Sequence, residues 1–215
     1  MKLPKVTAAA ALLCSLVASP VQAQAQQSCA AHYLIAVPGG GNTAEGIPDY
    51  VPHGGNVFMT GMLTRLGTGG EIQPLWVSYT STPFATSEYE KSKAGGLKRA
   101  RNTVSRLANA CPNAKFSFTG YSLGADIAAT ITSDIAAGRG PIEPERVSGV
   151  ALFANPHQGG NGAVLSAGTS PHSRGSLGSL PDGYGVLGPR VLEICRGDDL
   201  VCSMQESHRG LVAPA

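Results

Sequence analysis

The chain has 215 residues, of which 42% are hydrophobic, and this length and composition suit one domain with a sizeable core. Its formal net charge is +2 at pH 7, only 14% of its residues are charged, and no basic stripe or run of like charge is visible. Nucleic acid and anionic membrane surfaces are therefore excluded as expected partners.

The first element along the chain is a secretory signal peptide. Two lysines precede an apolar run at residues 8–17 that is too short to span a bilayer, and residues 21–23 (VQA) place small side chains where a signal peptidase reads them. We expect residues 1–23 to be removed, with cleavage after Ala25 as the alternative, and residues 24–215 to form a single exported domain without a transmembrane segment.

Strands and helices are expected to alternate along this domain. Apolar runs predict strands at residues 32–37, 72–79, 116–119, 147–153 and 190–194. Apolar residues at helical spacing predict helices at residues 56–66, 88–110 and 123–137. The pattern predicts an α/β fold, with a doubly wound central parallel sheet of about five strands and helices on both faces. Residues 157–188 are instead rich in Gly and Ser without periodicity, and so long a structureless segment is usually functional or mobile.

The sequence GYSLG at residues 120–124 lies between a predicted strand and a predicted helix. In that context Gly-x-Ser-x-Gly is a nucleophile elbow, a sharp and strained turn that leaves the serine Oγ exposed. Two glycines suit such a turn because strand and helix close on each other where no Cβ intervenes. Ser122 is therefore the candidate nucleophile, and the competing interpretation is a serine in an ordinary glycine-bounded loop.

A serine hydroxyl needs a base to take its proton and a third group to orient that base. In this architecture the partners follow the serine in the order acid, then histidine. Asp198 and Asp199 lie in an acidic loop at 195–202 after the last predicted strand, and His208 is the only histidine beyond that loop. His157 precedes the acid and fits this order poorly. The competing interpretations are a solvated turn for the aspartates and an exposed terminal residue for His208.

Backbone N–H groups are expected to hold the oxyanion that develops during attack. One belongs to Leu123, the residue after the nucleophile, at the positive end of its helix. The second should come from the glycine-rich loop at residues 38–43 (PGGGNT), since glycines let backbone N–H groups approach a substrate. A phosphate-binding loop is the alternative, but the Gly-Lys-Ser/Thr ending is missing.

Four cysteines remain in the exported domain, namely Cys29, Cys111, Cys195 and Cys202. An even number in an exported protein favours two disulfides, and the sequence alone allows three pairings. Cys195 and Cys202 are close enough to clip one loop. A metal site is the alternative, but no Cys-x2-Cys pair is present, so no metal is expected.

Together these residues resemble the cutinase family of secreted serine esterases, of the actinobacterial type. The resemblance extends from Cys29 to His208, and its most specific parts are ACPNA at 110–114 ahead of the elbow and the spacing Cys-x3-Asp-x2-Cys at 195–202. The family usually has Gln at the position of Leu123 and Ser or Thr at the position of Gly40.

The resemblance implies a small, lidless α/β-hydrolase and a set of site residues. Matched by position, the implied triad is Ser122, Asp199 and His208, and the implied oxyanion donors are the N–H groups of Leu123 and Gly40. The implied disulfides are Cys29–Cys111 and Cys195–Cys202.

We therefore expect a secreted serine esterase, extracellular or associated with the cell envelope, that hydrolyses carboxylic esters through an acyl-enzyme. The expected substrate is a lipid, polyester or acylated polysaccharide ester, with no cofactor, and the protein is expected to be a monomer. The alternatives are an acetylxylan-type or envelope-glycolipid esterase or acyltransferase, and a catalytically silent secreted binding protein on the same scaffold.

Overall fold

Strands and helices alternate in the computed structural model, which describes residues 29–54, 72–82 and 86–204. The strands are β1 (His32–Val37), β2 (Ile72–Trp76), β3 (Lys115–Tyr121), β4 (Val147–Phe153), β5 (Val164–Leu165) and β6 (Val191–Ile194). The helices are α2 (Thr86–Ala110), α3 (Leu123–Ala136) and two short 3-10 helices, η2 (Pro144–Arg146) and η3 (Gly185–Arg190).

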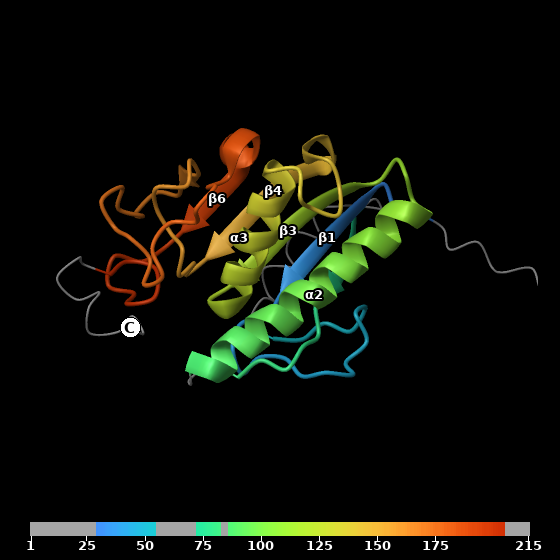
Figure 1. Ribbon diagram of the computed structural model, residues 1–215, viewed down its shortest axis with the longest axis horizontal. Helices are drawn as coiled ribbons and strands as arrows, with labels where there is room; N and C mark the ends of the chain where they lie inside the picture. Colours follow the sequence, from blue (N-terminus) through green and yellow to red (C-terminus); the bar gives the residue numbers. More distant parts are fainter. Residues whose placement is uncertain (1–28, 55–71, 83–85, 205–215) are drawn as a thin grey trace, which may run out of the picture.

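All strand pairs of the sheet are parallel, and their order is β2-β1-β3-β4-β6-β5. The predicted α/β fold with one central parallel sheet is confirmed. The chain first builds from β1 to β2 and then returns to the other side of β1 with β3, so the order reverses between β1 and β3. In open α/β sheets, ligands bind outside the carboxyl ends of the strands at such a switch point. The fold therefore directs attention to the carboxyl ends of β1 and β3 (Figure 1).

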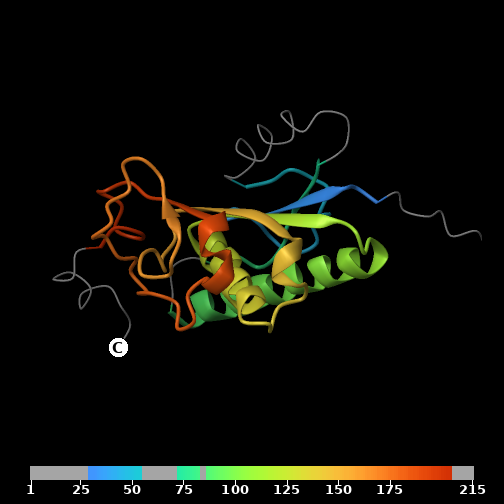
Figure 2. The same ribbon diagram turned by 90° about the horizontal axis from the view of Figure 1, so that it is seen from above.

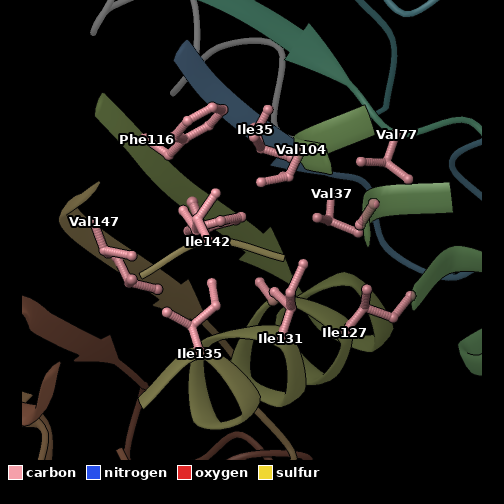
Figure 3. Close-up of a cluster of buried hydrophobic side chains, with 14 of the residues drawn as sticks. Ile35, Val37, Val77, Val104, Phe116, Ile127, Ile131, Ile135, Ile142 and Val147 are labelled. Atoms are coloured by element: carbon pink, nitrogen blue, oxygen red, sulfur yellow. The ribbon is translucent and has the colours of Figure 1, made fainter. Parts of the chain in front are cut away.

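The two long helices cover the same face of the sheet (Figure 2). Helix α3 points Ile127, Ile131 and Ile135, spaced by four residues, into a cluster of buried apolar side chains against the strands (Figure 3). The helix predicted at residues 56–66 lies outside the described residues.

Helix α2 packs against α3 through a glycine. A Cβ at Gly96 would collide with Ile127 of α3 and would lie 3.1 Å from the Tyr79 ring. The close approach of the two helices offsets the low helix propensity of glycine at this position. No helix in the described part of the chain combines the length and the apolar character that a bilayer crossing requires.

The structure departs from the predicted elements at two places. The sheet has six strands rather than about five, because Val164–Leu165 within the segment 157–188 pairs with β6. Strand β2 ends at Trp76, three residues before the predicted end, and beyond it the hydroxyl of Tyr79 donates to the carbonyl oxygen of Pro38 (2.6 Å).

Both disulfides implied by the family resemblance are present. Cys29–Cys111 ties the chain before β1 to the end of α2, and Cys195–Cys202 closes the short loop after β6. The sequence separations are 82 and 7 residues. On the chain-entropy model, closing the long loop stabilises the fold by about 4–5 kcal/mol and closing the short one by about 2–3 kcal/mol.

Candidate active site

The turn between β3 and α3 has the strained geometry expected of an elbow. Ser122 is half-buried and has φ 54° and ψ −121°. A non-glycine residue with positive φ is uncommon and persists only where the surrounding structure imposes it. Here the N–H of Ser122 donates to the carbonyl oxygen of Phe153 (2.9 Å), which fixes the turn to the end of β4.

The two glycines of the motif are required by close backbone approach. A Cβ on Gly120 would collide with the carbonyl oxygen of Gly124, so the strand and the helix could not close on each other. A Cβ on Gly124 would collide with the carbonyl oxygens of Val37 and Pro38. The first turn of α3 therefore lies directly against the end of β1, at the switch point of the sheet.

The glycine-rich loop after β1 lies beside the elbow. Gly39 packs so closely on Tyr121 that a Cβ there would lie 2.9 Å from its ring and from its carbonyl oxygen. The N–H of Gly41 donates to the carbonyl oxygen of Ser81 (2.6 Å). The N–H of the half-buried Gly40, in contrast, has no acceptor within the described ranges. The N–H of Leu123 belongs to the first turn of α3, where backbone donors lack intrahelical acceptors. The glycine-rich loop and the first turn of α3 thus each offer a backbone donor near the elbow.

The two aspartates of the acidic loop have different surroundings. Asp199 is half-buried, and its Oδ1 accepts hydrogen bonds from the N–H groups of Val201 (2.8 Å) and Cys202 (3.4 Å). No donor among the described residues pairs with its Oδ2. The Asp198 side chain is 71% exposed and pairs with Arg196 on the surface (2.8 Å). Asp199 is thus the anchored carboxylate with a free oxygen.

Backbone hydrogen bonds connect the serine to the acidic loop across three strand ends. Ser122 pairs with Phe153 of β4, and the next residue, Ala154, donates to Ile194 of β6 (3.0 Å). Ala154 also packs against the Cys195–Cys202 disulfide and is the second non-glycine residue with positive φ in the described part of the chain (50°). Two strand spacings separate the serine from the acidic loop, about 10 Å, which leaves room for an imidazole ring between them.

The third predicted triad residue, His208, lies outside the described residues. The described chain ends at Met204, whose N–H donates to the carbonyl oxygen of Arg174 (2.8 Å). His157 lies near this edge of the sheet, but its Nδ1 is 2.8 Å from the carbonyl oxygen of Gly178 and its Nε2 is 3.2 Å from Asp126. Both ring nitrogens are therefore engaged away from a serine.

Asp126 is a buried carboxylate that sequence analysis did not single out. It lies one turn after Ser122 on α3 and is fully buried. Its oxygens are 2.8 Å from Lys93 Nζ, 2.8 Å from the Tyr89 hydroxyl and 3.2 Å from His157 Nε2. The His157 contact is close but is not aligned for a hydrogen bond. A charged residue in the first turn of a largely apolar helix was the available signal.

The charges around Asp126 keep it ionised. Burial raises the pKa of this carboxyl group, but the contacts with His157 and Lys93 outweigh burial, and its pKa is lowered below the usual 3.8. In turn, burial and the Asp126 charge raise the pKa of Tyr89 far above its usual range, so that its hydroxyl stays a donor.

The chain matches the family model described as Cutinase over residues 41–210. Among curated relatives, Carboxylesterase Culp1 of Mycobacterium tuberculosis is 26% identical over 164 residues, which cover 76% of this chain. The chain spans 65% of the length of that relative.

Solved structures show the same architecture. The catalytic core domain of acetyl xylan esterase from Trichoderma reesei matches with a TM-score of 0.65 at 16% identity, over 85% of this chain and 92% of that one. A cutinase-like protein from Cryptococcus sp. matches with a TM-score of 0.60 at 21% identity, over 86% of this chain and 87% of that one. At these identities the structures establish the α/β-hydrolase fold alone, and the match to the family model covers most of the sequence. The chain belongs to the cutinase family.

Proposed function

We propose that this protein is a secreted serine esterase that hydrolyses carboxylic esters through an acyl-enzyme. The observation that carries the proposal is the strained Ser122 turn, which lies beside the glycine-rich loop after β1 and is joined by its N–H to the end of β4, the neighbour of the strand that leads to Asp199. Membership of the cutinase family and the similarity to a carboxylesterase support the same activity.

The mechanism assigns one role to each group. Ser122 Oγ attacks the ester carbonyl carbon while His208 takes the hydroxyl proton, and the carbonyl π electrons move onto the oxygen. The N–H groups of Leu123 and Gly40 hold that oxyanion. When the tetrahedral intermediate collapses, the ester C–O bond breaks and His208 gives the proton to the leaving alcohol.

The second half of the reaction, deacylation, releases the carboxylic acid. His208 takes a proton from water, the resulting hydroxide attacks the acyl carbon, and the bond to Ser122 Oγ breaks as the serine recovers its proton. Asp199, held by its Oδ1, accepts the imidazole N–H at its free oxygen and stabilises the imidazolium.

Export is part of the proposal. The predicted signal peptide at residues 1–23 would direct the chain across the membrane, and the two disulfides fit an oxidising compartment. The natural ester is a lipid, a polyester or an acylated polysaccharide.

A panel of p-nitrophenyl esters from acetyl to long acyl chains tests the activity and ranks these substrates. Preference for acetyl would favour an acetylated polysaccharide, and preference for longer chains a lipid or polyester. Turnover in an alcohol-containing buffer, with the transferred ester measured, distinguishes acyl transfer from hydrolysis.

The matched pair Ser122→Ala and Ser117→Ala tests the nucleophile. Ser117 lies on β3, the strand that leads into the Ser122 turn, and its Oγ is 2.9 Å from His32 Nε2, so it is a serine beside a histidine at the opposite end of the sheet. Ser122→Ala should abolish turnover and labelling by a fluorophosphonate probe, whereas Ser117→Ala should retain both. Labelling that survives in Ser122→Ala would refute the assignment, and an inert wild-type protein would favour the silent binding scaffold.

A further inference from the structure

Two buried carboxylates hold the loop at residues 155–161 from opposite sides. Asp126 comes from α3, which begins at the elbow, and Glu193 comes from β6, which leads into the acidic loop. The two side chains are 0% and 1% exposed. The loop therefore spans from the element that carries the proposed nucleophile to the element that carries the proposed acid.

On the nucleophile side, His157 provides the contact. Its Nδ1 is 2.8 Å from the carbonyl oxygen of Gly178, which only accepts, and its Nε2 is 3.2 Å from the Asp126 carboxylate. The ring therefore lies between the carbonyl oxygen of Gly178 and the carboxylate of Asp126. The N–H of Asp126 donates to the carbonyl oxygen of Ser122 (3.1 Å), so the same residue touches the elbow through its backbone and the loop through its side chain.

On the acid side, Glu193 accepts from three donors. Its Oε1 receives Asn155 Nδ2 and the Tyr184 hydroxyl, each at 3.1 Å, and its Oε2 receives the N–H of Gly159 at 3.0 Å. Asn155 in turn accepts the N–H of His157 through its Oδ1 (3.0 Å). A continuous chain of polar contacts thus runs from Ser122 through Asp126, His157 and Asn155 to Glu193, two residues before Cys195.

We propose that the loop at residues 155–161 is a brace that sets the spacing between the nucleophile elbow and the acidic loop, with His157 and Glu193 as its positioning residues. This inference rests on the proposed function, because it assigns the brace a role in the alignment of the Ser122–His208–Asp199 triad. Catalytic groups need to be held to about 0.5 Å, and a misplacement of about 1 Å costs on the order of 100-fold in rate. The polar chain is buried, so its contacts are not exchanged for contacts with water.

The test uses His157→Gln and Glu193→Gln, which perturb the brace from its two ends. Asp134→Asn is the matched control. Asp134 also lies on α3 but outside the brace, and its carboxylate pairs with Arg101 of α2 (2.6 Å) near the far end of α3. For each purified variant, kcat and KM on a soluble p-nitrophenyl ester, the rate of fluorophosphonate labelling and the melting temperature are measured. We expect both brace variants to lose at least tenfold in kcat and in labelling rate with KM within about twofold, and Asp134→Asn to lose melting temperature alone.

Each outcome decides between the claims. A wild-type protein that neither turns over esters nor reacts with the probe overturns the proposed function. An active wild type with folded brace variants that keep wild-type kcat overturns the brace and leaves the esterase assignment standing. If His157→Gln does not fold, the nearly isosteric Glu193→Gln decides alone.

Discussion

The two halves of this molecule are ordered by different forces. From β1 to α3 the structure rests on apolar side chains at regular spacing, such as Ile127, Ile131 and Ile135 against the sheet. From Asn155 to η3 the chain is largely irregular, and most of its buried side chains are polar ones, many of them joined by hydrogen bonds. The comparison shows that a segment without periodicity can still be specified, through buried polar groups that each need a partner.

The largest loss of stability is expected from a cavity in the apolar half. Ile131→Ala removes a fully buried side chain from the α3–sheet contact and should cost about 2–5 kcal/mol of unfolding free energy. The matched control is Val186→Ala in η3, whose side chain is 71% exposed and should change stability by less than about 0.5 kcal/mol. Urea denaturation measures both, and equal effects would contradict the assignment of the core.

A single polar truncation in the irregular half should cost less but still be measurable. Asn161 is buried, donates to the carbonyl oxygen of His157 (2.6 Å) and accepts the N–H of Leu180 (2.8 Å). Asn161→Ala leaves both partners unsatisfied and should cost about 1–3 kcal/mol. The exposed Asn102 of α2 provides the control, and an Asn161→Ala variant as stable as Asn102→Ala would show that the irregular half does not depend on its polar contacts.

The buried carboxylate of Asp126, where the two halves meet, should make stability sensitive to acid. The pKa of Asp126 in the folded protein is lowered below its usual 3.8, so the unfolded chain binds the proton first as pH falls. The stabilisation from Asp126 is then complete above the unfolded value and is lost as pH falls through the folded one. Urea midpoints of wild type and Asp126→Asn, compared at a series of acid pH values, should converge as pH drops below 3.8. A constant difference across the series would contradict the ion-pair assignment.

The smallest effect is expected where the two halves join. Ala154 has φ 50°, and glycine at that position would relieve backbone strain but add conformational freedom to the unfolded chain. The two contributions are each about 1 kcal/mol and opposite in sign, so Ala154→Gly should change stability by less than about 1 kcal/mol. Thermal unfolding measures this, and a loss of several kcal/mol would show that the Ala154 methyl group is needed against the Cys195–Cys202 disulfide.

Sequence reasoning succeeded where the physical signal is local or periodic. The helix at residues 123–137 and the elbow context of Ser122 follow from spacing and from two glycines, and the structure has both features. The predicted roles of Ser122, Asp199, Leu123 and Gly40 fall on groups placed at one edge of the sheet, and these roles stay predictions.

Sequence reasoning failed where order depends on contacts between distant residues. Strand β5 has two residues and no pattern of its own, since it exists only through its pairing with β6. Apart from Thr130 on the same helix, the partners of Asp126 among the described residues come from α2 and from the loop after β4, which no spacing rule connects. The disulfide pairing was open from the residues alone for the same reason.

The Cys29–Cys111 disulfide has a consequence for the nicked protein. It encloses β1, the glycine-rich loop, β2 and α2 in one covalent ring, while Ser122 lies eleven positions outside it. A protease that cuts the backbone anywhere inside the ring leaves two fragments that still travel together on a non-reducing gel and part only after thiol treatment. If a protease cleaves the loop that carries Gly40, the fragment before the cut therefore stays joined through Cys29–Cys111 to the fragment that contains Ser122.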